Sequence, residues 1–388
     1  MKLFFISTMP SNRWGGSEEL WAAAARHALE QKQAVFISAP ARDEPLHAQF
    51  AELKNQGAQL YLRNARDVNS VLQRGMFKLQ RKLKNIPAVP QSYYEFSEAV
   101  KNFNPDFLCV SQGGVFDVVE YPEIMWLLKN SGKPFFLIGQ SNLEHRVYSY
   151  PYLQRIREIY KAAKKIYFIA QRNLEGAKRQ LAMPDFTNYV VVKNPCRLTE
   201  RTVEEYPAGE QARFAMVGRL QCRNKGHDIL LQVLSAETWK SKNWMLNIYG
   251  EGDDLKYLQE LAAYFGISDK MRFHGYESNV RKIWKQNHIL LMPSIEEGTP
   301  LALIEAMACG RTAVVTDVGD NAALIHEGEN GFVAEAPTVK LIHSALERAW
   351  LKKDEWQAFG VNAHAFIETY IDQQPGKHLL EDMLTSIS

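Results

Sequence analysis

The sequence predicts an α/β protein with two doubly wound domains, each built on a parallel β-sheet. Short unbroken apolar runs alternate with longer helical patterns, which is typical of parallel strands covered by helices on both faces. The alternation falls into two separate series within 388 residues, a length that suits two domains better than one core. Doubly wound sheets bind ligands beyond the carboxyl ends of their strands, so we expect a site in a cleft where two such edges face each other.

The first series of runs predicts a Rossmann-like N-terminal domain over residues 1–195. The apolar start of the chain is interpreted as a buried strand and not as a signal peptide, because no long hydrophobic segment with a small-residue cleavage site is present. A helical pattern across residues 17–31 follows it. The strands expected in this domain are LFFIS (3–7), AVFISA (34–39), FLCVSQ (107–112), FFLIGQ (135–140), KIYFIA (165–170) and YVVVKNP (189–195).

The second series predicts a Rossmann-like C-terminal domain over residues 196–365. The stretch 193–211, with an Asn-Pro, a Tyr-Pro and several charged residues, is interpreted as the linker. Residues 366–388 are expected to form a helical segment that packs back on the N-terminal domain. The expected strands of the second domain are RFAMVGRL (213–220), WMLNIYGEG (244–252), MRFHGY (271–276), HILLMPS (288–294), TAVVTD (312–317) and GFVAEA (331–336).

Composition argues against several classes of protein. No run approaches the roughly 20 apolar residues of a membrane span. The four cysteines show no Cys-x-x-Cys pair, which argues against disulfides and a metal site and favours a reduced, cytoplasmic protein. Charge is uneven, with 27 Lys and Arg against 18 Asp and Glu in residues 1–200, and 19 against 26 in the remainder. The two halves are therefore expected to meet different partners.

The loop SIEEGTP (294–300) is a candidate anion site. It lies between a predicted strand and the helical run LALIEAMAC (301–309). Pro300 suits the first helical position, and Gly298 would let a ligand approach the backbone. The positive end of a helix attracts anions, so an anion is expected to bind the backbone amides of Thr299, Leu301 and Ala302.

Charged side chains surround the same predicted edge of the second domain. VGRLQCRNKG (217–226) places Arg219 at a strand end and Lys225 shortly after it, next to glycines. Arginine can hold phosphate oxygens through two N–H bonds, and lysine adds a compact charge. Solvated loop cations are the commoner case, but the pairing favours a functional interpretation. Glu297 and Glu305 would flank the crevice and accept hydrogen bonds from hydroxyls. A nucleotide sugar has both a diphosphate and hydroxyls, so it would contact all of these groups.

The first domain has a weaker candidate in GGSEEL (15–20), directly after its first strand. Ser17 is a suitable N-cap, and acidic residues occupy the first turn. A capped helix behind a Gly-Gly turn explains this motif without any ligand, so both interpretations stay open.

The run EEGTPLALIEAMACGRTAVVTDVGDNAALI (296–325) resembles the signature region of family 4 retaining glycosyltransferases with the GT-B architecture. Its E-x7-E pair falls on Glu297 and Glu305. The Gly-Gly loop, the VGRL…KG element, YGEGDD (249–254) and FHGY (273–276) match in order. The resemblance covers nearly the whole chain and is strongest over residues 213–335.

The resemblance implies a role for each candidate residue. Arg219, Lys225 and Glu297 would be catalytic: the two cations neutralise the leaving diphosphate, and Glu297 holds the donor sugar. Glu305 would accept hydrogen bonds from the ribose hydroxyls. The N-terminal domain would bind the acceptor and the C-terminal domain the donor. The segment Phe273–Tyr276 would lie near the nucleobase. Further donor-binding positions implied by the resemblance are Gly16, Gly250, His274, Tyr276, Gly298, Thr299, Pro300 and Leu301.

The resemblance also implies the course of the reaction. The donor's own phosphate would take the acceptor's proton on the same face of the sugar, which gives retention without a protein nucleophile. No metal and no cofactor are expected; a UDP- or GDP-linked sugar is the substrate. Many family members carry a histidine after the strand that corresponds to residues 135–140. Gln140 stands there in this chain, and either His145 replaces that histidine or it is an ordinary surface residue.

A basic stretch, QRGMFKLQRKLKNI (73–86), could lie on an anionic membrane or form a solvated helix face. Nucleic acid is not expected, because no aromatic residues suited to bases are interleaved with the cations.

The sequence therefore predicts a retaining, metal-independent hexosyltransferase, cytoplasmic or at the inner face of the membrane. Its acceptor would be a surface glycan or a lipid-linked saccharide. The alternatives are a nucleotide-sugar epimerase of the same architecture and a non-catalytic protein that binds sugar nucleotides.

Overall fold

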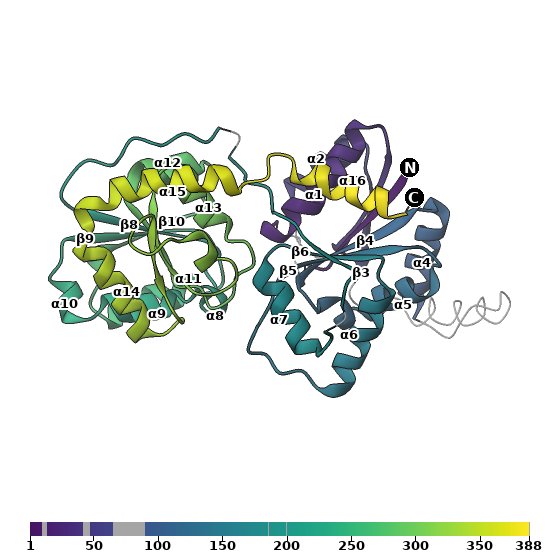
Figure 1. Ribbon diagram of the computed structural model, residues 1–388, viewed down its shortest axis with the longest axis horizontal. Helices are drawn as coiled ribbons and strands as arrows, with labels where there is room; N and C mark the ends of the chain where they lie inside the picture. Colours follow the sequence, from purple (N-terminus) through teal and green to yellow (C-terminus); the bar gives the residue numbers. More distant parts are fainter. Residues whose placement is uncertain (10–13, 42–46, 65–89, 185, 199, 388) are drawn as a thin grey trace. The chain divides into compact units, whose positions relative to one another are not determined.

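The computed structural model describes residues 1–388 except 10–13, 42–46, 65–89, 185, 199 and 388. The basic stretch 73–86 lies outside the described residues. The chain forms two compact units (Figure 1). The first comprises Met1–Pro195 with Gln373–Ser388, and the second comprises Cys196–Asp372.

The described residues of the first unit form a seven-stranded parallel sheet with the order β3-β2-β1-β4-β5-β6-β7. All six predicted strands are present, and β3 is an additional edge strand that the sequence analysis missed. Its sequence, QLYLRN, mixes polar and apolar residues because an edge strand is less buried than a central one. The strands are β1 (Lys2–Ser7), β2 (Ala34–Ala41), β3 (Gln59–Asn64), β4 (Phe107–Gly114), β5 (Phe135–Ser141), β6 (Lys165–Phe168) and β7 (Tyr189–Val191).

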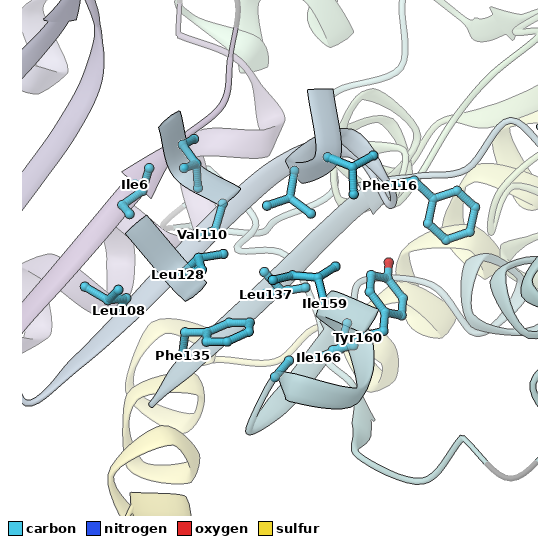
Figure 2. Close-up of a cluster of buried hydrophobic side chains, with 14 of the residues drawn as sticks. Ile6, Leu108, Val110, Phe116, Leu128, Phe135, Leu137, Ile159, Tyr160 and Ile166 are labelled. Carbon is cyan, nitrogen blue, oxygen red and sulfur yellow. The ribbon is translucent and has the colours of Figure 1, made fainter. Parts of the chain in front are cut away.

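Two hydrophobic cores cover the two faces of this sheet. Along β1, Phe4 and Ile6 belong to one core, whereas Leu3 and Phe5 belong to the other, which explains the unbroken apolar run. Figure 2 shows part of the first core, with labelled residues of β1 (Ile6), β4 (Leu108 and Val110) and β5 (Phe135 and Leu137). This core includes side chains of α4 (Gln91–Phe103), α5 (Pro122–Asn130), α6 (Tyr150–Ala162) and α7 (Gln171–Leu181), and the other includes side chains of α1 (Gly16–Glu30), α2 (Ala48–Asn55) and α16 (Pro375–Ile387).

The C-terminal segment divides between the units. The helix α15 (Trp356–Tyr370) belongs to the second unit, and the chain enters the first unit at Gln373. There α16 packs against α1 (Figure 1). The carboxylate of Asp382 fixes its position by pairing with Lys165 Nζ at 2.8 Å and by accepting a hydrogen bond from Tyr167 at 2.7 Å.

The described residues of the second unit form a six-stranded parallel sheet with the order β10-β9-β8-β11-β12-β13. The six predicted strands are all present, as β8 (Ala212–Val217), β9 (Trp244–Tyr249), β10 (Met271–Gly275), β11 (Ile289–Met292), β12 (Thr312–Thr316) and β13 (Gly331–Ala334). The helices are α8 (Cys222–Lys225), α9 (His227–Leu234), α10 (Glu237–Lys240), α11 (Leu255–Tyr264), α12 (Val280–Gln286), α13 (Leu301–Ala308), α14 (Val339–Leu351) and α15. Short 3₁₀ turns complete the two units at Asp117–Glu120, Ser268–Lys270, Ala322–Leu324 and Lys353–Glu355.

Each sheet reverses its strand order at one place. In the first sheet the chain returns from β3 to β4 on the other side of β1, and in the second it returns from β10 to β11 on the other side of β8. Ligands of doubly wound sheets bind beyond the carboxyl ends of the strands at such a reversal. The loops after β1, β4, β8 and β11 are therefore where a site is expected.

Candidate active site

Three loops interlock at the carboxyl edge of the second sheet. Gly226, with φ +63°, lies against the loop after β11, and a Cβ there would come within 2.2 Å of the Pro293 carbonyl oxygen. Gly250, with φ +141°, lies against the loop after β8, and a Cβ there would come within 1.9 Å of the Gly218 carbonyl oxygen. Any other residue at either position would strain the backbone and push the loops apart.

Lys225 and Glu297 join two of these loops. Lys225 Nζ lies 2.5 Å from Glu297 Oε1, and Ser294 Oγ donates to the same oxygen at 2.8 Å. The lysine side chain is 28% exposed and the glutamate 10%. An ammonium has three N–H donors, so a phosphate oxygen can share it with the carboxylate. The contact therefore holds a cation and a carboxylate together at the position where the strand order reverses.

Further bonds fix the same pair of loops. The carbonyl oxygen of Asn224 accepts from the amides of Ile295 at 2.8 Å and Glu296 at 3.1 Å. The Asn224 side chain donates to the Glu296 carboxylate at 2.5 Å. Arg219 follows β8 directly and is half-buried at the start of the loop that ends in Lys225. The predicted phosphate-binding cations thus share one well-anchored loop.

The start of α13 differs by one residue from the prediction. Pro300 is extended, with φ −80° and ψ 90°, and the helix begins at Leu301. The Pro300 carbonyl oxygen accepts from the amides of Leu303 at 3.0 Å and Ile304 at 3.1 Å, so proline stands immediately before the helix and not inside it. Thr299 and Gly298 are buried beside this helix start, and Gly298 accepts from the amide of Asp320 at 3.2 Å.

Glu305 lies on α13, with 1% of its surface exposed. Its Oε1 is 2.7 Å from Nε of Arg197, a residue at the start of the second unit. A buried carboxylate needs such a partner, because an uncompensated charge away from water is costly. The sequence analysis missed Arg197, since nothing in its surroundings distinguishes it from the other cations near the linker. A ribose contact to Glu305 would be made beside this ion pair.

The ends of β9 and β10 bring the predicted nucleobase residues together. The His274 ring stacks on Tyr249, with centroids 4.5 Å apart and planes 9° apart, and its Nε2 lies 2.9 Å from Asn247 Oδ1. Burial, and then the charges of Lys282 and Arg272, lower the pKa of His274 below its ordinary value. Tyr276 is 68% exposed just beyond β10. A neutral imidazole and an exposed phenol are therefore available at this edge.

The loop after β1 precedes α1, which begins at Gly16. Gly15 occupies the N-cap position in an extended conformation, with φ −142° and ψ 178°, so the predicted Ser17 cap is wrong: the helix begins at Gly16, before Ser17. Glu18 is buried and accepts from Ser7 Oγ at 3.1 Å and Trp21 Nε1 at 2.8 Å. Burial outweighs these two bonds and raises the pKa of Glu18 to about 7.

Gln140, at the end of β5, is buried and has protein partners. Its Nε2 donates to the Ser17 carbonyl oxygen at 3.3 Å, and its Oε1 accepts from Asn194 at 3.0 Å. His145 is exposed on the loop that follows. Of the two acceptor-side candidates, Gln140 is therefore held by hydrogen bonds within the protein, whereas His145 is an exposed imidazole.

Other buried amides lie near this edge of the first sheet, and the sequence analysis did not single them out. Both polar side-chain atoms of Asn142, and Nε2 of Gln112, are buried without a hydrogen-bond partner among the described residues. Amide groups of this kind bind hydroxyls or water. Single amides in loops are too common for their types alone to reveal such a cluster.

The remaining expectations on cysteines, metals and membrane spans concern absences. All four cysteines are unpaired thiols. Over the described ranges, no helix has both the length and the apolar character that crossing a membrane requires. In the same part of the chain, no group of three or more His, Cys, Asp or Glu side chains is arranged to hold a metal ion.

Comparisons with known proteins bear on the second unit most directly. Residues 211–351 match the family model described as glycosyl transferases group 1. An uncharacterized glycosyltransferase of Haemophilus influenzae is 32% identical over 124 residues, which cover 32% of this chain and 35% of that protein. A lipopolysaccharide 1,6-galactosyltransferase of Salmonella typhimurium is 26% identical over 249 residues, which cover 61% of this chain and 64% of that protein. The chain thus spans less than two thirds of the length of either relative.

Several solved structures resemble the whole chain. HepE of Anabaena in complex with UDP has a TM-score of 0.72 at 14% identity, with 100% of both chains covered. At this identity the likeness concerns the fold, and the predicted GT-B architecture of two doubly wound domains is confirmed. The family match and the relatives confirm the resemblance to glycosyltransferases and do not support the epimerase alternative. Membership of family 4 in particular stays a prediction.

Proposed function

We propose that the protein is a retaining glycosyltransferase that moves a hexosyl group from a nucleotide sugar to an acceptor hydroxyl. The observation that carries this proposal is the junction of Lys225 with Glu297 at the strand-order reversal of the second sheet. A cation, a carboxylate and a helix start lie together there, which suits a ligand with both a diphosphate and hydroxyls. The glycosyltransferase family match over residues 211–351 supports it.

In the proposed reaction the bond between the sugar carbon and the diphosphate breaks, and its electron pair leaves with the nucleoside diphosphate. Arg219 and Lys225 stabilise the negative charge that develops on the leaving phosphate, with the backbone at the start of α13. The acceptor oxygen bonds to the sugar carbon on the face that the phosphate leaves, and a phosphate oxygen takes its proton. Retention then needs no protein nucleophile, and we propose that no metal takes part.

Glu297 is assigned to binding the donor sugar. Its carboxylate is already held by Lys225 and Ser294, so one oxygen is oriented by the protein. Both partners bond Oε1, so Oε2 can accept hydrogen bonds from the hydroxyls of the donor sugar. Gly16, from the first unit, and Glu305 complete the proposed contacts, to the diphosphate and to the ribose.

The proposed donor is UDP- or GDP-linked, and the proposed acceptor is a glycan or a lipid-linked saccharide. HepE, which has the same fold, binds UDP, and the Salmonella relative is a lipopolysaccharide galactosyltransferase. We therefore place the reaction in the biosynthesis of a surface polysaccharide, lipopolysaccharide or glycolipid. A cytoplasmic enzyme that acts at the inner face of the membrane would reach both substrates.

A binding and turnover screen tests the proposal. Thermal-shift measurements with UDP, GDP, ADP and their sugars should show stabilisation by one nucleotide class. The matching sugar nucleotide should then transfer its sugar to a saccharide acceptor, or be hydrolysed slowly without one. A protein that binds the donor but returns it intact under all acceptors would instead be the non-catalytic alternative.

A further inference from the structure

A chain of buried amides lies behind the imidazole of His274. Asn247 lies on β9 and Asn287 follows α12, and both are buried. Asn247 Nδ2 lies 2.8 Å from Asn287 Oδ1, and Asn247 Oδ1 lies 2.9 Å from His274 Nε2. This series of hydrogen bonds ends at the carbonyl oxygen of Ile283, 2.8 Å from Asn287 Nδ2. Each contact joins groups whose donor and acceptor roles can be worked out.

The Ile283 carbonyl sets the direction of every hydrogen bond in this chain. A carbonyl oxygen only accepts, so the NH₂ group of Asn287 must face it, and the amide oxygen of Asn287 must face Asn247. The NH₂ group of Asn247 then donates to Asn287, which leaves its oxygen toward His274. An oxygen that only accepts requires a proton on Nε2 of the histidine.

Nδ1 of His274 is consequently the unprotonated nitrogen of a neutral ring. It forms no hydrogen bond with any residue in the described part of the chain. Tyr249 covers one face of the His274 ring, yet His274 is exposed to solvent. An oriented acceptor atom is thus presented at the carboxyl edge of the second sheet. Gly250 connects this edge to the loop of Arg219, because its amide donates to the Gly275 carbonyl oxygen at 2.7 Å and it lies against Gly218.

We propose that Asn247 and Asn287 are positioning residues that lock His274 as the Nε2–H tautomer, so that Nδ1 accepts an N–H of the donor's base. The proposal rests on the nucleotide-sugar function above and sharpens it. Uracil and guanine present a ring N–H between or beside carbonyl groups, so either base supplies the donor. A histidine whose two tautomers interconvert freely would present either a donor or an acceptor to the base, and would therefore not select a base that donates an N–H.

The tautomer can be measured without any ligand. A long-range ¹H–¹⁵N correlation spectrum of the full chain with ¹⁵N-labelled histidine, near neutral pH, distinguishes a protonated from an unprotonated ring nitrogen. His274, identified by loss of its signals in His274→Gln, is expected to show the Nε2–H pattern. The Nδ1–H pattern, or an even mixture, would overturn the proposal.

Two other histidines provide references in the same spectrum. His288 Nδ1 accepts from the Arg213 amide at 3.0 Å, and its Nε2 lies 3.0 Å from the Pro207 carbonyl, so it must be the Nε2–H form. His364 Nδ1 lies 2.9 Å from the Ala308 carbonyl oxygen, so it must be the Nδ1–H form. His274 should match the first and differ from the second.

A pair of substitutions tests the relay itself. Asn247→Leu removes the oxygen that holds Nε2–H, so the tautomers of His274 should mix. Tyr249→Phe keeps the stacked ring and removes only a hydroxyl that Asn287 Nδ2 also reaches, at 3.1 Å, so the tautomer should not change. An unchanged tautomer in a folded Asn247→Leu protein contradicts the relay, and if that variant does not fold, the wild-type spectrum decides.

Ligand titrations separate this proposal from the function on which it rests. UDP or GDP should shift the Nδ1 resonance, whereas inorganic pyrophosphate should not. Asn247→Leu should weaken binding of that nucleotide about two- to tenfold, the effect of one neutral hydrogen bond, with pyrophosphate affinity unchanged. Nucleotide binding without any Nδ1 shift would overturn the proposal alone. Failure of every nucleoside diphosphate to bind would overturn the proposed function, while the tautomer result would still stand.

Discussion

Both units reverse their strand order once, yet the carboxyl edges at the two reversals differ in chemistry. At the second, Lys225 pairs with Glu297, and Arg197 pairs with Glu305. At the first, the charged side chains of Arg63 and Asp117 bond the backbone of Ser7 and Gly114. Buried amides and Glu18, whose burial favours its neutral form, lie beside them. Topology therefore fixes where a site can form, and the loop residues decide whether that site is ionic.

The overall charge of each half does not reveal this difference. Residues 1–200 carry the excess of basic side chains, but, within the described ranges, the unpartnered polar groups near the carboxyl edge of the first sheet include the buried amides of Gln112 and Asn142. The remainder of the chain is acidic on balance and nevertheless places Arg219 and Lys225 in the segment that follows β8. Charge counts reflect mainly solvated surface, whereas the position of a charge relative to a strand end indicates a ligand.

The largest expected effect is the loss of the cations at the second edge. Arg219→Ala and Lys225→Ala should each lower kcat/KM about 10²–10³-fold, because each removes a donor from the leaving phosphate. Arg223→Ala is the matched control, since Arg223 is an exposed cation of the same loop. Steady-state kinetics with the identified donor and a thermal melt of each variant provide the measurements. Wild-type rates in both of the first two variants would refute the assignment.

A smaller effect is expected at the first edge, from Glu18. Its pKa is raised from 4.5 to about 7, so the folded state holds a proton that the unfolded state has released between these values. Stability is fully present below about pH 4.5 and falls as pH rises through about 7, by roughly 3 kcal/mol at most. Glu18→Gln mimics the neutral acid and should abolish this slope. The free energy of unfolding against pH, followed by hydrogen exchange in β1, should show the difference; parallel curves would contradict it.

His227 should give the opposite slope in the second unit. It is buried, neither ring nitrogen has a partner among the described residues, and burial lowers its pKa to about 4. The free energy of unfolding is therefore unaffected by protonation of His227 above about pH 6.5. It decreases as pH falls through about 4, again by roughly 3 kcal/mol at most. His227→Leu loses no hydrogen bond and should flatten this window. Hydrogen exchange in β8 between pH 4 and pH 7 is the measurement, and an unaltered acid slope would count against the assignment.

The smallest effect is expected at the acceptor-side candidates. His145 is exposed and no hydrogen bond anchors it to the described residues, so His145→Ala should change kcat/KM less than about threefold. Kinetics at saturating donor with varied acceptor measure this. A tenfold or larger loss would assign His145 to the acceptor and make the first edge more ionic than the comparison holds.

The sequence predicts the fold well because its strands are buried on both faces. Consecutive residues of β1 enter different cores, and this produces the unbroken apolar runs that identify strands. The edge strand β3 lacks such a run and was missed. The helix α13 begins one residue after Pro300. Pro300 is extended and takes the N-cap position, where its carbonyl oxygen accepts the first hydrogen bonds of the helix.

The candidate site could be predicted only in part. Motif spacing brings Lys225 and Glu297 to adjacent strand ends, and the structure places them in contact. Arg197 could not be found this way, because it meets Glu305 through tertiary packing and not through local spacing. The relay behind His274 was also missed, since two asparagines on separate elements have no sequence signal in common.

The central claim is that the donor's diphosphate binds the loops after β8 and β11. A crystal structure of the full chain with UDP, or with GDP if the screen selects it, tests this directly. We expect phosphate oxygens within hydrogen-bond distance of Arg219 and Lys225 and near the amides of residues 298–302. A nucleotide bound elsewhere, with Arg219, Lys225 and Gly298 all turned away from it, would show that this claim is wrong.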